Sequence, residues 1–370
     1  MTNAIKNTFL SVTGSSLTTI AGFLVLCTMS LTLGRDLGIV MAKGVLLGVI
    51  TVLTLFPSLL LVFDKVIEKT KHKALNLKFD KLNKFIVKNH ILIIVIFAIL
   101  IAPMYLAYSK VNVYYKLDRS LPNTLESIKT NEILKNDYNI VSPEIILLDR
   151  NLKTNEVNNM IDKLENVDGI DFVLSYSKIK SLGITENMLG KDITSIFENN
   201  KYQMILVNST YDIATDELND QITEVKNIVK EYDKDAIVAG EGPLMKDLIE
   251  ISDTDFNNVN TSSIICIFII LIIVLKSLSL PILLISAIEF AIFTNMGVSY
   301  FSGTILPFIA PIVLGTIQLG ATIDYAILMT TTYLNKRNIG IKKEDAMLDT
   351  LNYTGNSIFV SAMCFFAATF

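Results

Sequence analysis

The chain has 370 residues, of which 51% are hydrophobic and 18% charged, with a formal net charge of −4 and a mean hydropathy of +0.49. This composition is too apolar for an ordinary soluble enzyme and too charged for a bare bundle of membrane helices. It indicates a membrane protein that also carries a water-exposed domain.

Long apolar windows mark the candidate membrane-spanning segments. A helix needs about 20 predominantly apolar residues to cross the hydrocarbon core of a bilayer. Six windows suit a span and a seventh continues to the last residue: Phe9–Leu33, Leu37–Phe63, Ile91–Tyr108, Ser262–Leu275, Leu280–Tyr300, Leu306–Leu334 and Ser357–Phe370. The first window is too long for a signal-peptide core and no A-x-A-like site follows it, so we expect it to be retained.

Residue types that commonly bind metals are few and scattered. Cys27, Cys266 and Cys364 all lie inside apolar windows, which favours membrane-embedded side chains over disulfides or metal ligands. His72 and His90 lie in or beside a lysine-rich segment, with no partner at ligand spacing. The sequence also lacks a G-x-x-x-x-G-K-[ST] motif, which argues against an ATP-driven machine. We therefore expect no metal and no cofactor.

Positive charge in two connecting segments predicts the orientation. Asp64–Lys88 holds eight lysines and three acids, and Asn335–Ala346 holds four basic residues. By the positive-inside rule both are expected in the cytoplasm, which places Val111–Val259 outside. Apolar residues recur among the lysines of Asp64–Lys88, as they would in an amphipathic helix on the inner leaflet, and a solvated basic linker fits equally well.

The sequence therefore predicts a polytopic α-helical membrane protein with an inserted extracytoplasmic α+β domain. The expected parts are two transmembrane helices (1–63), a cytoplasmic basic amphipathic linker (64–88), a transmembrane helix (89–110), the extracytoplasmic domain (111–258), three transmembrane helices (259–334), a cytoplasmic loop (335–352) and a truncated transmembrane helix (353–370).

The long outer segment has the pattern of a small α+β sandwich of split-βαβ type. Expected strands are Glu144–Asp149, Phe172–Ser177, Tyr202–Thr210 and Ala236–Gly240, and helix-like stretches lie around Glu156–Glu165, Ile213–Tyr232 and Leu244–Ser252. Val111 to Asp255 holds 27 acidic and 15 basic residues, a net charge of −12, which argues against nucleic acid as a partner. The segment contains no histidine or cysteine, so binding or conduction is favoured over chemistry.

Asp324 lies near the middle of an apolar run. An ionised aspartate at the centre of a spanning helix costs about 2.5–3.5 kcal/mol on insertion scales, so such residues face the bundle interior and are usually functional. Tyr325 adds a phenol beside it, and small residues on the same helix permit close helix packing and leave room for water or a hydroxyl relay: Gly315, Thr316, Gly320, Ala321 and Thr322. We favour a proton relay over an aspartate that only fixes helix packing.

A second intramembrane acid, Glu289, lies in "SAIEFAIFTNMGVSY" without a neighbouring glycine cluster. Coupling to transport and local hydrogen bonding are equally compatible with this position.

Three stretches carry a resemblance to a known family. The helix "LGATIDYAILMTTTYLNKR" resembles the Asp-Tyr signature helix of the resistance-nodulation-division (RND) superfamily, in particular its MMPL-type branch of hydrophobe and amphiphile exporters. The opening "SVTGSSLTTIAGFLVLCTMSLTLGRDLGIVMAKGVLLGVITVLTLFPSLLLVFDK" is similar to the fifth and sixth helices of that family. "AGEGPLMKDLIEISDTDF" resembles the end of its porter domain.

The resemblance implies a transporter driven by the proton-motive force, with two pseudo-repeats of six helices and one extracytoplasmic porter domain each. It further implies that Asp324 and Tyr325 are the second-half members of the proton-relay pairs, and that the outer α+β segment is a porter domain. The expected substrate is a lipid or another amphiphilic molecule, and membrane lipids are expected partners. A homo-oligomer is a further possibility that the sequence leaves open.

A short internal repeat supports this arrangement. "TGSSLTTIA" (Thr13–Ala21) and "TGNSIFVSA" (Thr354–Ala362) share four of nine residues at an offset of 341. The same offset places a first-half counterpart of Asp324 before Met1. We therefore expect the chain to be an internal fragment of a protein about twice as long, with the first-half repeat as its partner.

The function expected from the sequence is that of a proton-driven exporter of lipids or other amphiphiles in the plasma or inner membrane. Two alternatives stay open. One is a relative in the same superfamily that serves protein translocation or sterol sensing, and the other is a non-transporting membrane receptor or scaffold whose acidic outer domain binds a partner. Neither the substrate nor the oligomeric state follows from the sequence.

Overall fold

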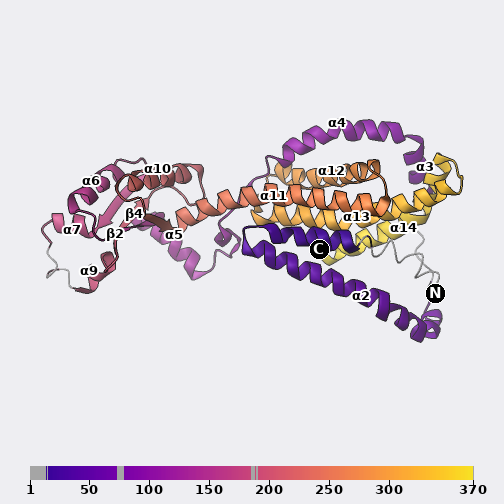
Figure 1. Cartoon of the computed structure of the whole chain (residues 1–370), viewed down its shortest axis with the longest axis horizontal. Helices are drawn as coiled ribbons and strands as arrows, with labels where there is room; N and C mark the ends of the chain where they lie inside the picture. The colour runs from indigo at the N-terminus through magenta and orange to yellow at the C-terminus, as the bar shows by residue number, and fades with distance from the viewer. Residues whose placement is uncertain (1–13, 15, 73–78, 185–187, 189–190, 370) are drawn as a thin grey trace. The chain divides into compact units, whose positions relative to one another are not determined.

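The computed structural model describes residues 14, 16–72, 79–184, 188 and 191–369 (Figure 1). The chain divides into two compact units. One, which we call the helical unit, comprises Met1–Val113 and Thr254–Phe370, and the other, the α+β unit, comprises Tyr114–Asp253.

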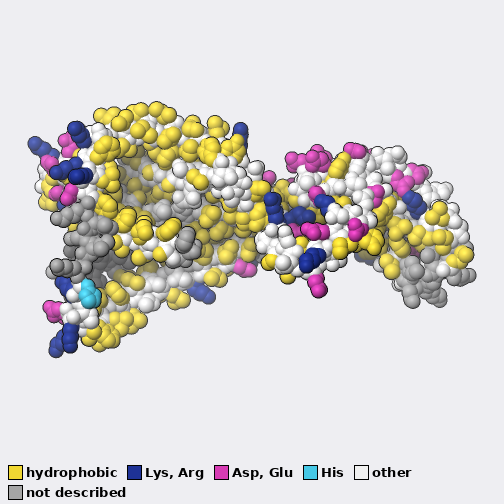
Figure 2. Space-filling view, turned by 180° about the vertical axis from the view of Figure 1, so that it is seen from behind, with side chains coloured by type: hydrophobic (Ala, Val, Ile, Leu, Met, Phe, Trp, Pro, Cys, Tyr) yellow, Lys and Arg dark blue, Asp and Glu magenta, His cyan; other side chains and the backbone are white. Residues whose placement is uncertain are grey.

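Five helices of the described residues are long and apolar enough to cross a membrane: α2 (Thr32–Lys69), α4 (His90–Tyr108), α11 (Glu241–Leu275), α12 (Ser279–Ser302) and α13 (Ile309–Asn338). The helical unit also contains an apolar helix at Ser16–Thr28, whose last turn is the 3-10 helix η1 (Leu26–Thr28), the helices α3 (Asp80–Lys88) and α14 (Lys343–Thr369), and the short strand β6 (Leu306–Pro307). The prediction of a polytopic α-helical membrane protein is confirmed. Figure 2 shows hydrophobic side chains over much of the visible face of this unit and a cluster of Lys and Arg at one end.

Several helices differ in length from the predicted windows. The first window begins at Phe9, outside the described residues. α2 continues to Lys69, into the segment predicted as a linker, because "DKVIEK" contains no helix breaker. α14 begins at Lys343, ten residues before the predicted boundary, because Lys343–Thr354 contains no glycine or proline and the helix continues through Gly355 into the apolar run.

The α+β unit contains one four-stranded antiparallel sheet with the strand order β3-β4-β2-β5. Its strands are β2 (Ser142–Asp149), β3 (Ile170–Ser175), β4 (Tyr202–Ser209) and β5 (Ile237–Gly240), preceded by β1 (Val113–Tyr114) at the boundary between the units. Its helices are η2 (Leu117–Ser120), α5 (Glu126–Tyr138), α6 (Thr154–Leu164), α7 (Tyr176–Ser181), α9 (Lys191–Phe197) and α10 (Asp216–Tyr232). α6 connects β2 to β3 and α10 connects β4 to β5, which is the chain order of a split-βαβ sandwich.

The core of the α+β unit lies between the sheet and the two long helices. β2 contributes Ile146 and Leu148, α6 contributes Met160 and Leu164, and α10 contributes Val225 among other residues. Apolar residues recur on one face of both helices at the spacing of helical turns, so burying that face against the sheet is what holds the layers together.

A second core joins three helices of the helical unit. It is formed by buried side chains of α11 (Ile267, Leu271), α12 (Ile285, Ile288, Ile292, Met296) and α13 (Leu319, Ile323, Ile327). These helices lie side by side in Figure 1. The middle of α13 is therefore enclosed by packed helices on at least one side.

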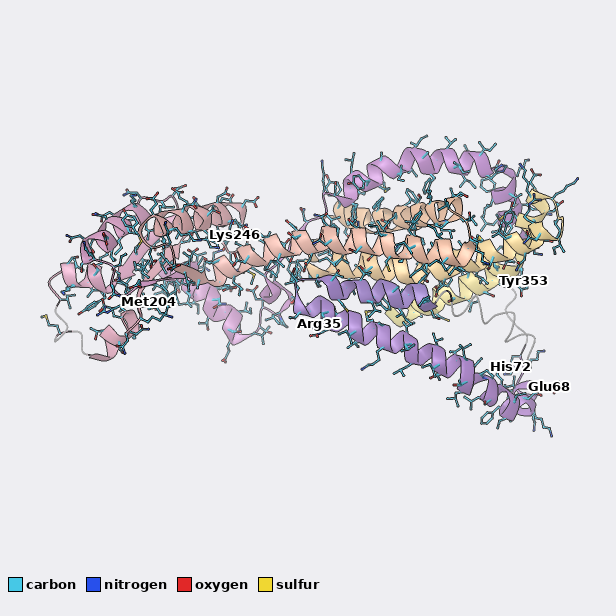
Figure 3. All side chains as sticks on the ribbon, viewed as in Figure 1. Arg35, Glu68, His72, Met204, Lys246 and Tyr353 are labelled. Carbon is cyan, nitrogen blue, oxygen red and sulfur yellow. The ribbon has the colours of Figure 1, made fainter. Side chains whose placement is uncertain are left out.

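α2 packs through a stripe of small residues and leaves most of its apolar surface exposed. Gly34, Gly38 and Ala42, four residues apart, are its buried positions. A Cβ on Gly38 would lie 2.6 Å from the backbone oxygen of Phe23, so only glycine permits this approach. Figure 3 places Arg35 at the opposite end of α2 from Glu68, so the packed stripe is near the Arg35 end.

A buried carboxylate holds the turn that precedes α2. Asp255 on α11 accepts hydrogen bonds from the backbone N–H groups of Ser30 and Leu31, at 2.9 and 3.1 Å. The first N–H groups of a helix have no partner within the helix, and Leu31 at the N-cap supplies no side-chain cap of its own. Asp255 therefore caps α2 from a neighbouring helix.

We expect Asp255→Ala to lower the free energy of unfolding by about 1–3 kcal/mol, because two buried N–H groups lose their acceptor. Hydrogen exchange at Ser30 and Leu31 should accelerate in the protein held in detergent micelles. Asn258→Ala, an exposed position one turn further along α11, is the control and should leave exchange unchanged. Equal exchange rates in Asp255→Ala and the unmodified protein would contradict the capping role.

Candidate functional site

Asp324 lies close to the middle of α13. Its side chain is half-buried, and its neighbours Ile323 and Ile327 are fully buried in the core shared with α11 and α12. The carboxyl group is therefore at the edge of a packed apolar region, in the middle of a helix that is long enough to span a membrane.

Tyr325, the next residue, turns toward another helix. Its hydroxyl lies 3.0 Å from the Ser361 Oγ of α14, and either oxygen can donate this hydrogen bond. Successive residues of an α-helix point about 100° apart, so the adjacent Asp and Tyr face different neighbours. The phenol thus links α13 to α14.

The helix Ser16–Thr28 meets α13 at Gly320. The Thr19 hydroxyl donates a buried hydrogen bond of 2.9 Å to the backbone oxygen of Gly320, and a Cβ on Gly22 would lie 3.6 Å from the Gly320 Cα. Residues four apart lie on the same face of a helix, about one turn from each other. The helix Ser16–Thr28 therefore packs on the face of α13 that carries Asp324, one turn away from it.

The other small residues of the predicted site have different environments. A Cβ on Gly315 would meet no described atom within 4 Å, so the close approach occurs at Gly320 and not at Gly315. The Thr322 hydroxyl donates to the Gln318 carbonyl at 2.6 Å and that of Thr316 donates to Ile312 at 2.9 Å. Ala321 is half-buried. Each threonine hydroxyl uses its proton within the helix and keeps its oxygen as an acceptor.

Glu289 is buried in α12, with 8% of its surface exposed. Its Oε1 has no hydrogen-bond partner among the described residues. The nearby Phe290 packs in a tilted arrangement on Phe97 of α4, and Phe293 packs edge-to-face on Tyr105, at ring centroid distances of 4.7 and 5.3 Å. A buried carboxyl with an unbonded oxygen is costly, so Glu289 is a functional candidate on structural grounds as well as on sequence.

Polar contacts also connect the helices around these acids. Asn295 of α12 donates to Gln318 of α13 at 3.1 Å. Near the start of α14, Asn83 of α3 donates to Asn352 at 2.7 Å, and Lys336 is paired with Asp349 at 3.4 Å. No group of three or more His, Cys, Asp or Glu side chains in the described ranges could hold a metal ion.

The sequence did not identify Thr19, Gly22 or Ser361 as part of this site. Thr19 and Gly22 are separated from Gly320 by about 300 residues, and an isolated sequence carries no distance information across such a gap. The available signal was the set of small and hydroxyl residues in "TGSSLTTIAG", which is typical of a helix surface that packs closely in a membrane.

We expect Gly22→Leu to lower the free energy of unfolding by about 1–3 kcal/mol, because the new side chain would have to separate its helix from α13. Gly44→Leu is the matched control, since a Cβ on Gly44 meets nothing within 4 Å of the described atoms. The free energy of unfolding of each variant is measured in detergent micelles. Equal stability of the two variants would contradict the close packing at Gly320.

The comparison with known families agrees with the resemblance described above. The family model of the MMPL family matches residues 1–90 and 154–370. No curated protein matches the chain at a significant level. Membership of this family indicates a transporter rather than an enzyme. The chain belongs to the MMPL family and is an RND-superfamily transporter of the MMPL type.

Proposed function

We propose that the chain forms part of an exporter of lipids or other amphiphiles that is driven by the proton-motive force across the plasma or inner membrane. Asp324 takes up and releases the proton, and Tyr325 assists as a hydroxyl relay. The α+β unit acts as an extracytoplasmic porter domain. Family membership supports transport, and the substrate class and energy source are inferences from the residues and the resemblance.

The observation that carries the proposal is the half-buried Asp324 in the middle of a membrane-length helix, one turn from a close helix contact. An ionised carboxylate here interacts with its neighbours differently from a neutral carboxylic acid, so the two forms favour different packing of α13. Gly320 lets the helix Ser16–Thr28 approach α13 closely, so a change in the packing of α13 at Asp324 bears directly on this neighbouring helix.

The membrane potential supplies enough free energy to shift α13 between two arrangements. One elementary charge that crosses a potential of 100 mV gains about 2.3 kcal/mol, which biases a two-state equilibrium by more than tenfold. Protonation of Asp324 from outside removes its charge, lets α13 shift against its neighbours and drives the rearrangement that moves the amphiphile outward.

Tyr325 and Glu289 have supporting roles in the proposal. The hydrogen bond between Tyr325 and Ser361 connects the relay helix to α14, so a change at Asp324 reaches a second helix through the adjacent residue. Glu289 is buried on α12, which shares the core with α13. We assign Glu289 to coupling between α12 and α13.

The test uses the full-length protein in inverted membrane vesicles that generate a proton gradient. A fluorescent short-chain phosphatidylethanolamine is the probe, and export is the fraction that becomes protected from a membrane-impermeant quencher. We expect a protonophore to abolish export, and Asp324→Asn to lower it by about tenfold or more, because the charge that couples to the potential is lost. Tyr325→Phe should give an intermediate loss.

Asp345→Asn, which removes an exposed acid at the start of α14, is the control and should retain export. Export that persists undiminished in Asp324→Asn would refute the relay. Export that a protonophore does not affect in the unmodified protein would refute the proton drive itself.

A further inference from the structure

Glu144 is an anomaly in the α+β unit. It lies on β2, where alternate residues point into the core, and it shares the buried row with Ser142, Ile146 and Leu148. Only 1% of its surface is exposed, and neither carboxyl oxygen has a hydrogen-bond partner among the described residues. Buried polar groups are nearly always hydrogen-bonded, so an acid in this position requires an explanation.

The first turn of α11 covers this acid. β5 ends at Gly240 and α11 begins at Glu241, so the next residue, Gly242, lies directly against β2. A Cβ on Gly242 would lie 2.9 Å from the Ser142 Oγ and 3.3 Å from the Glu144 Oε1. The Ser142 Oγ also lacks a described hydrogen-bond partner. The two side chains form a small polar site beneath the start of α11.

Apolar and uncharged groups complete the enclosure. In the sheet, Glu144 lies opposite Val207 of β4 and Gly240 of β5. Leu218 of α10 approaches the Gly242 Cβ position to 3.1 Å and is itself fully buried. An ionised carboxylate in such surroundings has lost the water that would solvate it.

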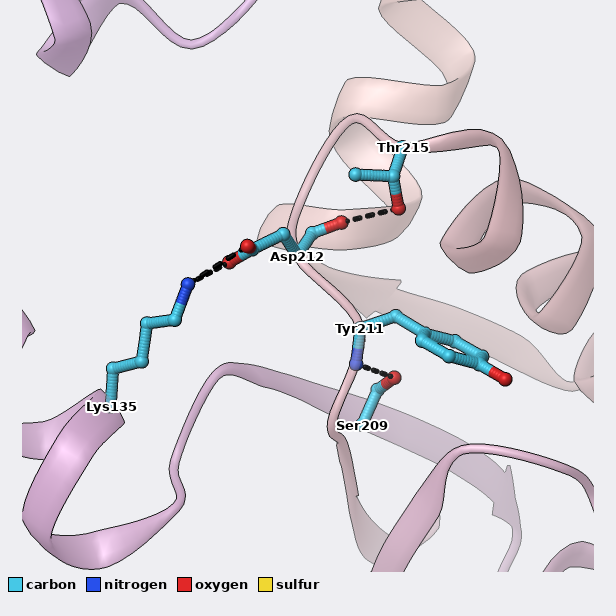
Figure 4. A network of polar contacts seen from close by, with 5 residues as sticks. All are labelled: Lys135, Ser209, Tyr211, Asp212 and Thr215. Atoms are coloured by element: carbon cyan, nitrogen blue, oxygen red, sulfur yellow. Dashed lines mark hydrogen bonds and ion pairs between the residues drawn. The ribbon is translucent and has the colours of Figure 1, made fainter.

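The N-terminal end of α10 is held in place beside this site. Ser209, the register partner of Ser142, accepts a hydrogen bond from the Tyr211 N–H at 3.1 Å (Figure 4). Asp212 forms an ion pair of 2.6 Å with Lys135, and Thr215 donates to the Asp212 carbonyl at 2.8 Å. This network uses its own polar groups, and none of these bonds reaches Glu144.

The charged groups near Glu144 come from α10 and α11. Lys226 of α10 is the cation whose field reaches Glu144, and it is paired with Asp247 of α11 at 3.2 Å. Lys246, labelled in Figure 3, donates to the Asn219 carbonyl at 3.1 Å. Both cations thus have oxygen partners elsewhere, and neither forms an ion pair with Glu144 in the described structure.

We propose that Glu144 is a proton-binding site of the α+β unit: the acid carries a proton while the first turn of α11 covers it, and gives up that proton when the cover opens and water enters. This site lies in a different unit from Asp324, and it stands whether or not Asp324 is a relay.

The enclosed form favours the protonated acid, because a neutral carboxylic acid loses less solvation free energy on burial than a carboxylate does. Burial raises the pKa of Glu144 from its ordinary value of 4.5 to about 7, and the field of Lys226 opposes this rise in part. A raised pKa means that the enclosed form is most stable below pH 4.5 and loses stability as the pH rises toward 7. External pH near neutrality would then control how firmly α11 is held at its start.

The test measures hydrogen exchange of residues 237–247 in the full-length protein in lipid nanodiscs, corrected for intrinsic exchange rates. Between pH 4.5 and 7 we expect the opening equilibrium to increase by about tenfold for each pH unit, and to level off above that range. Glu144→Gln keeps the shape of the side chain without a titrating group and should give a flat profile.

Glu224→Gln, an exposed acid on α10, is the matched control and should reproduce the profile of the unmodified protein. If Glu144→Gln fails to fold, Glu144→Leu replaces it, since an apolar side chain matches the next positions of the buried row, and it too should give a flat profile. A flat profile in the unmodified protein, or an unchanged pH dependence in the Glu144 variants, would overturn the proposal.

Discussion

The contact between the helix Ser16–Thr28 and α13 sets the environment of the intramembrane acid. Helices usually pack with 8–10 Å between their axes because side chains separate them. Gly22 and Gly320 remove those side chains, and the hydrogen bond from Thr19 to the Gly320 carbonyl fixes the approach. Asp324, one turn further along α13, therefore lies beside a tight seam between two helices.

The buried carboxylates of this protein differ in what they bond. Asp255 accepts two backbone N–H groups and so has a complete structural role. Glu144 and Glu289 are also buried, yet each has at least one oxygen without a hydrogen-bond partner among the described residues. A buried carboxylate whose oxygens accept hydrogen bonds stabilises one arrangement of the chain. A buried carboxylate oxygen without a partner raises the free energy of the folded state, and protonation of the acid lowers it. This distinction separates Asp255, which has a structural role, from Glu144 and Glu289.

Hydropathy and residue type were sufficient for much of the fold. The spans were found because a bilayer demands long apolar helices, and the strand β2 was found from its β-branched and aliphatic run. A helix was expected around Ile213–Tyr232, and α10 lies there, with Thr215 as its N-cap that accepts a hydrogen bond from the Leu218 N–H. Asp324 was recognised because a carboxylate in an apolar helix is rare.

Other features depend on distances that a single sequence does not contain. The partner of Gly320 is 301 residues away, and the cap of α2 comes from α11. Glu144 was treated as the polar start of a strand, because only the register with Val207 and Gly240 reveals that it faces the core. The continuity of α11 was missed because its first half is polar and its second half apolar, so the two parts suggested separate helices.

Because α11 is one continuous helix, it makes three separate contacts along its length. Gly242 covers Glu144, Asp255 caps α2, and Ile267 contributes to the core shared with α12 and α13. These contacts fall on both sides of the boundary between Asp253 and Thr254, so Gly242 serves the α+β unit, whereas Asp255 and Ile267 serve the helical unit. A hydropathy pattern reports only the apolar second half of such a helix, because the contacts of the first half are made by Gly242 and other residues outside the apolar run.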